Sequence, residues 1–432
     1  MQTVPGEIPL PSIKPAPWAR KLAPALGVFL CAACLLVLTV RGWSPAVLFV
    51  GCLLCLAVLA WGHLPPVPVE SSRAARLVCI VLVAPLVAVF VSSAFRADGY
   101  TGQLDAPLRF ALAVPIFLFA LRMRLDVAHS LRWMLPVALL LLLAARLVQG
   151  QPARWPAERM TTGFVDPLVF GYLSLTFGIM AMFGWPGEDR RSHPVIVGLA
   201  FVALALGASF SIGSQSRTGW LAVPLLAALW LHLHWSRARR WSLAWTAVGA
   251  CVVVVAAFMF VPTIHARVLE ALGEVMQYPW HSVPPDTPVS LRITYLRIAA
   301  DVFAQHPWLG VGLTPLLSPD TLPPLGYASP VAVKAALQSG FHNQIVSDAV
   351  RHGIGGLFAT VALLLVPLVV CLRALGSTSA VTRRNAAMGT AFFTCVFVAS
   401  FTTEVVDLKY MASLYAVMAA IFCGAALARR DD

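Results

Sequence analysis

Long apolar segments, separated by short polar loops, recur along most of the chain. A helix needs about 20 apolar residues to cross the hydrocarbon core of a bilayer, which is roughly 30 Å thick. Most of the segments reach that length and are typical of membrane-spanning helices. They lie at residues 23–40, 46–64, 76–95, 107–121, 133–149, 166–185, 194–212, 219–235, 242–263, 353–373, 385–403 and 410–427. The pattern predicts an all-α polytopic membrane protein with about twelve transmembrane helices.

The composition agrees with this fold class. Hydrophobic residues make up 59% of the 432 residues, charged residues make up 12%, and the mean hydropathy is +0.80. A soluble domain carries about 25% charged residues, so an ordinary soluble protein is excluded. Residues 1–22 are Pro-rich and polar, and no small-residue cleavage site follows the first apolar segment. We therefore expect that segment to be an anchor rather than a signal peptide.

The net charge of +12 follows from membrane topology. Basic residues concentrate in alternate loops, and the loops between them hold far fewer. Cytoplasmic loops carry this excess of Lys and Arg, so both termini are expected in the cytoplasm and no nucleic-acid partner is expected. The basic loops contain Lys14, Arg20, Lys21, Arg73, Arg76, Arg122, Arg124, Arg132, Arg190, Arg191, Arg237, Arg239, Arg240, Arg373, Arg383, Arg384, Arg429 and Arg430.

The nine cysteines all lie in apolar segments. Two pairs have the C-x-x-C spacing, Cys31 with Cys34 and Cys52 with Cys55. In soluble proteins that spacing is typical of metal or redox sites. Here the pairs have no His or charged neighbours, so we interpret them as small packing residues and predict no disulfide.

One loop is far longer than the others. With both termini in the cytoplasm, residues 264–352 are periplasmic and separate an N-terminal bundle, 1–263, from the last spans, 353–432. Helical patterns occur in this loop at 264–276 and 290–306. The second is amphipathic, which fits a helix lying on the membrane surface or covering the mouth of the bundle.

The second helix carries two arginines of different character. Arg297 has an acid four residues on, Asp301, and a pair of this spacing supports a structural interpretation of Arg297. Arg292 has no acid at such a position, and an unpaired arginine facing the outer cavity is suited to bind an anion. A solvated surface charge is the alternative for Arg292. The apolar face of the helix consists of Leu291, Tyr295, Ile298 and Val302.

Arg217 lies among small hydroxyl residues in SQSRTGW, 214–220, just before a predicted helix. A helix N-terminus offers free backbone N–H groups and a partial positive charge, which suit a phosphate. A guanidinium beside it can form two parallel hydrogen bonds to phosphate oxygens. The alternative, an arginine whose side chain reaches toward the membrane interface, is equally consistent with this position.

His342 and Asn343 stand where the long loop turns into a helix, in the sequence HNQIVSDAV. Imidazole is the side chain best suited to accept a proton near neutral pH. Asn343 is placed to orient the imidazole or to bind a sugar hydroxyl. A structural or surface role is the alternative for His342. Other histidines on the outer side are also candidates by position: His265, His281, His306 and His352.

Two weaker features complete the candidate chemistry. Arg159, in AERMTTGFVDP, is placed to reach the same outer cavity. Glu404 and Asp407, in the hairpin between the last two spans, are equally well placed to pair with Lys409.

Several absences narrow the function. No Walker loop, metal-ligand cluster or Asp-x-Asp motif of metal-dependent nucleotide-sugar enzymes occurs, so neither metal nor cofactor is expected. A periplasmic enzyme has no supply of nucleotides, and a membrane-held pyrophosphate would suit two arginines. None of the 19 acidic residues lies in the middle of a predicted span. Ion-coupled transporters usually place ionisable groups there, so this argues against a transporter.

A linked set of short motifs follows in order along residues 155–410. It consists of an R-x-T-G-like segment with D-P at 159–167, S-R-x-G at 216–219, R-x-x-Y and H-P-x-x-G-x-G within 292–312, H-N at 342, and G-x-x-G at 353–356. In this set the chain resembles the O-antigen ligase family, with the related O-antigen polymerases and pilin oligosaccharyltransferases. Tyr295 departs from the family pattern, in which Trp is more frequent.

The resemblance implies a membrane glycosyltransferase of the C-type class (GT-C) in the bacterial inner membrane, with its active site facing the periplasm. An O-antigen ligase moves the O-antigen chain from undecaprenyl pyrophosphate to a sugar hydroxyl of lipid A–core. The family reaction is regarded as inverting and independent of metal or ATP. Carried onto this chain, Arg217 and Arg292 would bind the pyrophosphate and His342 would deprotonate the acceptor. Arg159, Asn343 and Arg297 are possible additional site residues, and Arg297 could replace Arg292 as the donor ligand.

Three other functions remain open. A polymerase of the same superfamily joins two lipid-linked oligosaccharides and would show similar arginines and topology. A pilin or protein O-oligosaccharyltransferase would use a serine hydroxyl as acceptor. A transporter or flippase for lipid-linked glycans belongs to another class, and the missing midplane charges and the single large outer loop count against it.

Overall fold

The computed structural model describes residues 15–67, 69–96, 104–150, 152, 155, 158–184, 194–234, 269–270, 272–312 and 325–428. Its regular structure is entirely helical within these residues. The all-α fold predicted from the apolar pattern is therefore confirmed for this part of the chain.

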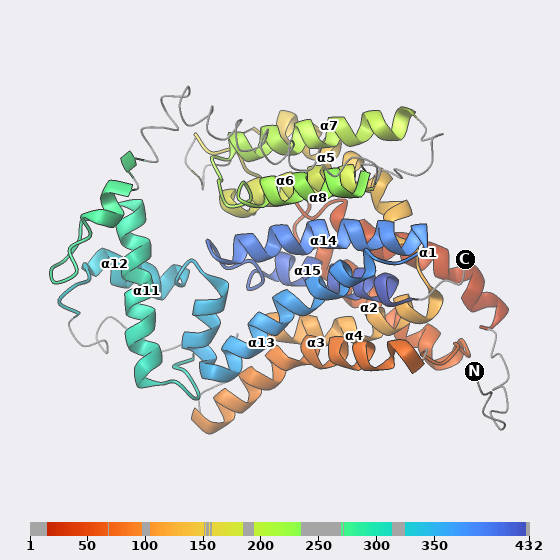
Figure 1. The fold of residues 1–432 in the computed structure, drawn as a ribbon, viewed down its shortest axis with the longest axis horizontal. Coiled ribbons are helices and arrows are strands. Elements are labelled where there is room, and N and C mark those ends of the chain that lie inside the picture. Colours follow the sequence, from red (N-terminus) through yellow and green to blue (C-terminus); the bar gives the residue numbers. More distant parts are fainter. Residues whose placement is uncertain are drawn as a thin grey trace.

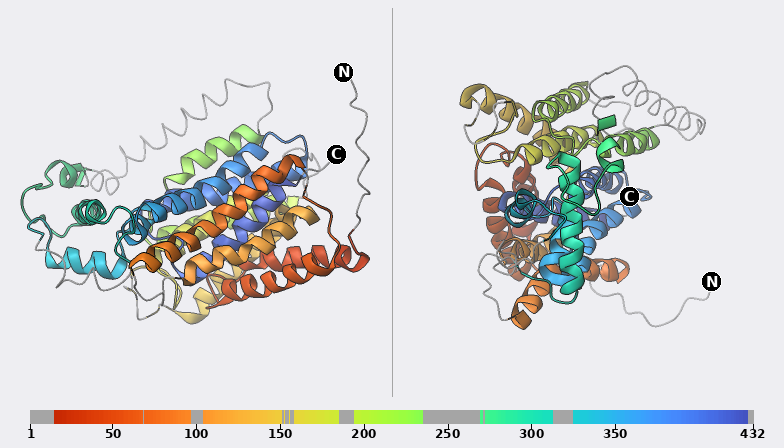
Figure 2. Two further views of the ribbon diagram at one scale, coloured as in Figure 1. Left: turned by 90° about the horizontal axis from the view of Figure 1, so that it is seen from below. Right: turned by 90° about the vertical axis from the view of Figure 1, so that its left-hand side faces the viewer.

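Most of the helices form one bundle, and two lie beyond its end. The bundle contains α1 (Pro17–Cys31), the 3-10 helix η1 (Ala32–Cys34), α2 (Trp43–Trp61), α3 (Val69–Arg96), α4 (Asp105–Met123), α5 (Val127–Gln149), α6 (Pro167–Phe183), α7 (Pro194–Gly213), α8 (Ala222–His234), α13 (Gln344–Ala374), α14 (Ala380–Ser400) and α15 (Lys409–Leu427). Beyond its end lie α11 (Pro288–Gln305) and α12 (Pro330–Ser339), as Figures 1 and 2 show. We call this end of the molecule the α11 end.

Seven of the described helices are long and apolar enough to cross a membrane: α2, α3, α4, α5, α7, α13 and α15. Shorter apolar helices occupy Pro167–Phe183 and Ala222–Leu233. The chain is thus a multi-pass membrane protein, and the figure of about twelve spans stays a prediction. Every predicted span except 242–263 coincides with a helix, and 242–263 lies outside the described residues.

The first predicted span, 23–40, is the clearest difference in detail. Its helix begins earlier, at Pro17, and ends at Cys31, and the chain then turns within the bundle. Backbone carbonyls freed in such a turn need other donors, because lipid offers none. The indole of Trp43 donates to the carbonyl of Ala32 at 2.6 Å, and the hydroxyl of Thr162 donates to that of Leu38 at 2.8 Å.

α15 forms the centre of the bundle, between α14, α13 and α4 (Figure 1). Of its apolar window, 89% is buried inside the protein. Small residues allow this close packing, because a Cβ on Gly424 would lie 2.6 Å from the Cβ of Ala120 on α4. The hydroxyl of Tyr415 donates to the carbonyl of Leu363 on α13 at 2.6 Å. Close backbone approach through small residues is typical of helix packing in membranes.

α13 changes direction at Gly353, where the backbone is left-handed (φ 65°, ψ −153°). The segment 306–312, after α11, lies directly against this bend. Val311 donates its N–H to the carbonyl of Val350 at 2.9 Å, and Ile354 donates to that of Pro307 at 2.8 Å. A Cβ on Gly353 would lie 2.3 Å from the carbonyl oxygen of Trp308, so only glycine fits.

This backbone pairing explains the H-P-x-x-G-x-G and G-x-x-G motifs as the connection between α11 and α13. The boundary drawn at residue 353 between loop and last spans stays a prediction, since α13 runs across it. The predicted helix 290–306 is confirmed as α11, with Tyr295, Ile298 and Val302 buried against the rest of the protein. The other predicted loop helix, 264–276, lies partly outside the described residues, and 272–276 are helical.

Candidate active site at the α11 end

His342 lies in the short connection between α12 and α13, and its backbone is left-handed with φ 50°. Its imidazole is half-buried, and the ring centroid lies 5.7 Å from that of Tyr295 on α11, with 34° between the planes. A left-handed backbone is uncommon for residues other than glycine, and it occurs most where the surroundings hold a side chain for function. The His342 imidazole is therefore held against α11 at an exposed edge.

Hydrogen bonds on either side hold the His342 loop in place. The N–H of Phe341 donates to the hydroxyl of Ser347 at 3.2 Å, and that hydroxyl donates to Glu404 at 2.7 Å. Asn343 caps α13, since its side-chain oxygen accepts the N–H of Val346 at 3.1 Å. Asn343 makes no hydrogen bond to His342 in the described structure. No contact therefore supports its predicted role in orienting the imidazole. Its amide nitrogen is the group left for a sugar hydroxyl.

Arg292 lies on α11 one turn before Tyr295, and its side chain is exposed. Residues three apart on a helix are neighbours, about 5–6 Å between Cβ atoms. Arg292 is therefore beside the contact of Tyr295 with His342. Among the described residues no direct contact joins Arg292 to His342, and Tyr295 is the residue of α11 that touches the imidazole.

Arg297 has a different partner from the predicted one. Its guanidinium lies over the ring of Tyr327, 3.9 Å from the centroid, and within 5.4 Å and 5.8 Å of the Trp280 and Tyr278 centroids. The expected ion pair with Asp301 is not formed, because the Tyr327 hydroxyl donates to that carboxylate instead. Aromatic faces attract a guanidinium through their negative quadrupole. Arg297 thus has a structural role in the α11–α12 region.

Arg159 and Arg217 meet in a second neighbourhood, on the α6, α7 and α8 side. The Arg159 Nε donates to the carbonyl of Ser214 at 3.1 Å, and the N–H of Met160 donates to that of Gly213 at 2.9 Å. Arg217 lies three residues after Ser214 in the chain, and its side chain is exposed. Its carbonyl accepts the N–H of Trp220 at 3.0 Å, in a turn that separates it from the start of α8. The predicted helix N-terminus beside Arg217 therefore lies one turn farther along the chain.

The hairpin between α14 and α15 lies between the two neighbourhoods. Its last residues reach Tyr410, whose ring meets that of Phe164 edge-on at 5.9 Å, near Arg159. Its middle reaches α13, since Val406 donates its N–H to the side chain of Gln344 at 2.9 Å. Among the described residues no direct contact joins Arg217 to His342. The start of α15 contacts Phe164, and the hairpin before it contacts the start of α13.

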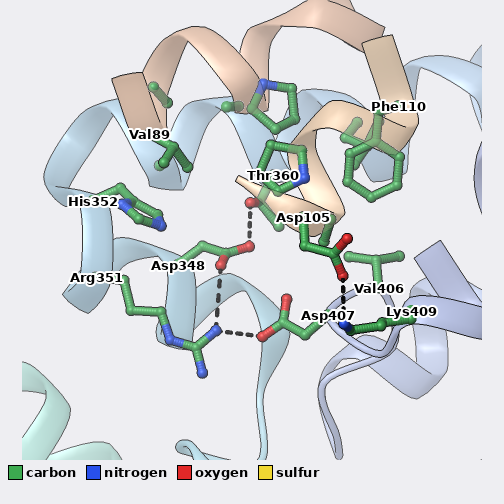
Figure 3. Close-up of a pocket in the computed structure, with 17 residues that line it drawn as sticks. Val89, Asp105, Phe110, Asp348, Arg351, His352, Thr360, Val406, Asp407 and Lys409 are labelled. Carbon is green, nitrogen blue, oxygen red and sulfur yellow. Dashed lines mark hydrogen bonds and ion pairs between the residues drawn. The ribbon is translucent and has the colours of Figure 1, made fainter. Parts of the chain in front are cut away.

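A polar network at the start of α13 was not predicted from the sequence (Figure 3). Arg351 forms an ion pair with Asp407 and lies 3.9 Å from Asp348. The Gln344 amide donates to Asp407 at 2.6 Å and to Asp348 at 2.9 Å. The Thr360 hydroxyl also donates to Asp348, at 2.6 Å. These contacts fix the helix that follows His342 to the α14–α15 hairpin.

The network corrects the expected pairing of Lys409. Lys409 lies 3.6 Å from Asp105 on α4, whereas Asp407 pairs with Arg351 and Glu404 accepts from Ser347. The physical reason is that the hairpin folds back over α13, which places its two carboxylates next to that helix. The signal in the sequence was helical spacing, since Gln344, Asp348 and Arg351 recur on one face.

Charge within the network affects Asp407. Burial alone would raise the pKa of its carboxyl, but the Arg351 guanidinium and the Gln344 amide outweigh burial and hold that pKa below its ordinary value. Asp407 is thus kept ionised, and its charge keeps Arg351 in place. The network is suited to hold the His342 loop in position.

The remaining histidine candidates are placed away from the His342–Tyr295 contact. His281 and His306 are exposed, and His352 is buried with its Nδ1 3.2 Å from the hydroxyl of Ser92. His265 lies outside the described residues. Within the part of the chain that the structure describes, no group of three or more His, Cys, Asp or Glu is arranged to hold a metal ion.

A half-buried imidazole can accept a proton, and an exposed guanidinium one turn before the tyrosine that contacts it can bind an anion. Two further arginines at the same end of the bundle add positive charge. No curated protein sequence matches the chain. Residues 200–361 match the family model described as O-antigen ligase, a stretch that includes Arg217, Arg292 and His342. This match, over residues 200–361, supports the O-antigen ligase family for the chain.

Proposed function

We propose that the protein is an O-antigen ligase, which transfers O-antigen from undecaprenyl pyrophosphate to a sugar hydroxyl of lipid A–core. The observation that carries the proposal is the His342 imidazole, held in a left-handed loop against Tyr295 of α11, the helix that carries Arg292, within the matched stretch. The α11 end then faces the periplasm of a bacterium, both termini are cytoplasmic, and the bundle spans the inner membrane.

In this reaction the His342 imidazole takes the proton of the acceptor hydroxyl. The hydroxyl oxygen attacks the anomeric carbon of the donor sugar from the face opposite the pyrophosphate, which inverts the configuration. The bond from that carbon to the pyrophosphate oxygen breaks, and undecaprenyl pyrophosphate leaves. Arg217 and Arg292 bind the pyrophosphate and stabilise the negative charge that develops on it.

The expected contributions are large enough to measure. A general base typically contributes about 10²–10⁴-fold to the rate. Loss of one oriented donor to a developing charge typically costs about 10²–10³-fold. The reaction uses no metal, because the two guanidinium groups supply the charge that a cation would otherwise provide.

The first experiment is a lipopolysaccharide gel from ligase-deficient cells that express this chain or its His342→Ala variant. It is combined with a probe for polymer on the lipid carrier. For the variant we expect bare lipid A–core and long polymer retained on the carrier. His306→Ala is the matched control, since His306 is exposed at the end of α11, and it should behave as wild type. Full lipopolysaccharide in the His342→Ala cells would contradict the assignment.

The polymerase is the second candidate, because the superfamily match applies to it equally. The same gel distinguishes the two functions. Cells that lack only the polymerase have core capped with a single repeat and no long polymer on the carrier. If this chain were a polymerase, its expression would restore long polymer in those cells. A ligase would leave that phenotype unchanged.

A further inference from the structure

An apolar groove runs along the outside of the bundle between α3 and α13. It encloses about 900 Å³ and is lined almost wholly by hydrophobic side chains. Ile80, Val87 and Phe358 on its walls are each more than half exposed. At the α11 end it is bounded by Trp308, in the segment that pairs with the bend of α13. A long apolar groove on a membrane-facing surface is suited to hold hydrocarbon chains.

A polar cavity of about 320 Å³ adjoins the groove at the α11 end (Figure 3). The two spaces share Ala88, His352 and Ala359 in their linings, so they lie side by side. The cavity volume is at the lower end of the range for small-molecule sites, about 300–1,000 Å³. The combined shape therefore fits an amphiphile with a small head and long tails.

The charges of the cavity disfavour a phosphorylated head group. Three carboxylates line it, from Asp105, Asp348 and Asp407, against two cations, from Arg351 and Lys409. The two cations are already paired with carboxylates, so an added phosphate would find no free cation. The carboxylates are likewise occupied by these cations, so an ammonium head would find no free anion.

A neutral head with several hydroxyl groups can form hydrogen bonds to both the carboxylates and the cations of the cavity. Each hydroxyl can donate to a carboxylate and accept from a guanidinium or ammonium. The site thus differs in chemistry from the arginines Arg159, Arg217 and Arg292, which suit an anion.

We propose that the groove and cavity together bind a glycolipid whose sugar head carries no phosphate, with its tails in the groove and its sugar in the cavity. This is a second lipid site, separate from the proposed pyrophosphate site. The proposal of this site does not depend on the proposed transfer reaction, because its test measures lipid binding and not sugar transfer.

The test uses two photoreactive lipids with identical diazirine-bearing acyl chains and different heads. One is a glucosyl diacylglycerol and the other a phosphatidic acid, each added to the full-length protein in phosphatidylcholine vesicles. Labelled peptides are mapped by mass spectrometry. We expect the glucosyl lipid to label α3 and α13 about tenfold more than the phosphatidic acid does, which corresponds to the net loss of one or two hydrogen bonds.

A pair of glycine variants tests the groove. Gly355 faces Ala88 across it, and a Cβ there would lie 3.9 Å from the Ala88 Cβ, an ordinary contact, so Gly355→Leu is chosen to fill the groove. Gly198 on α7 is exposed with open space around it, and Gly198→Leu is the matched control. We expect Gly355→Leu alone to lose the labelling of α3 and α13.

Three results would overturn the proposal. They are equal labelling of α3 and α13 by the two lipids, stronger labelling by the phosphatidic acid, and labelling that persists in Gly355→Leu. The comparison of heads on the wild-type protein needs no variant, so it remains decisive if Gly355→Leu folds poorly. A protein that binds the glucosyl lipid but transfers no sugar would support this site and refute only the proposed function.

Discussion

The imidazole of His342 and the ring of Tyr295 lie 5.7 Å apart, tilted by 34°, at the point where α11 meets the loop before α13. Tyr295 is only 4% exposed, so its position is set by the packing of α11. The imidazole in contrast is half-buried and open on one side. A rigid aromatic surface thereby fixes the direction in which the imidazole can accept a proton.

The first prediction concerns this aromatic surface. Tyr295→Phe and Tyr295→Trp keep a ring beside His342 and should retain transfer within a factor of about three, whereas Tyr295→Leu should lose about tenfold. The measurement is the rate of transfer by purified protein, with thermal unfolding as a check on folding. A Tyr295→Leu protein of normal stability and full rate would show that the ring does not position His342.

The second prediction separates the two arginines of α11. Arg292 is exposed, so Arg292→Ala should lower transfer by about 10²–10³-fold and leave the unfolding temperature unchanged. Arg297 lies among three aromatic rings, so Arg297→Ala should lower the unfolding temperature instead. Binding of undecaprenyl pyrophosphate gives an independent readout. The reverse pattern, with stable Arg297→Ala protein that fails to bind the donor, would transfer the donor role to Arg297.

The third prediction compares two ion pairs at opposite ends of the bundle. Arg351 pairs with Asp407 at the α11 end, and Arg384 pairs with Asp126 at the other end at 2.8 Å, with similar partial burial. Asp407→Asn and Asp126→Asn should each lower the free energy of unfolding by about 2 kcal/mol, after allowance for partial exposure. Only Asp407→Asn should also slow transfer, because only that pair holds the helix after His342. Equal effects of both substitutions on transfer would refute a positioning role.

The pH dependence of the same pair gives the fourth prediction. The pKa of Asp407 is lowered in the folded protein, so its contribution to stability is fully present above its ordinary pKa of about 3.9. The contribution is lost as the pH falls through the lowered value. Unfolding measured from pH 7 to pH 3 should therefore show a loss of stability below about pH 4 that is smaller in Asp407→Asn. An identical acid limb in both proteins would contradict this.

The fifth prediction concerns the second neighbourhood. Arg217 is exposed, so Arg217→Ala should express normally and lose about 10²–10³-fold in transfer. Arg159 holds the turn before Arg217 through the carbonyl of Ser214, so Arg159→Ala should affect transfer less and raise amide exchange in the turn at 214–217. Transfer at the wild-type rate in a well-expressed Arg217→Ala protein would remove Arg217 from the site.

The sequence was informative where physical signals are local. Apolar runs placed the helices, and a period of 3.6 residues identified the buried face of α11 through Tyr295, Ile298 and Val302. Contacts between segments that are far apart in the chain could not be predicted from the sequence. The i,i+4 spacing of Arg297 and Asp301 predicted an ion pair, but Tyr327 from a later segment lies between them. The pairing of Asp407 with Arg351 likewise depends on how the last hairpin folds over α13.

In the candidate site, too, local features could be predicted from the sequence and contacts between distant residues could not. The residue types at His342, Arg292 and Arg217 suggested acid–base and anion chemistry, yet spacing could not place them relative to one another. A left-handed backbone at a histidine has no sequence signature. The polar network behind it was visible only as helical spacing of Gln344, Asp348 and Arg351.

The backbone pairing of 306–312 with the bend of α13 has a mechanical consequence. Gly310 and Gly353 bring two main chains together with no side chain between them, and main chains bonded in this way move as one piece. Arg292 is carried at one side of this joint and His342 at the other. A displacement of the end of α11 is therefore expected to carry the bend of α13 with it.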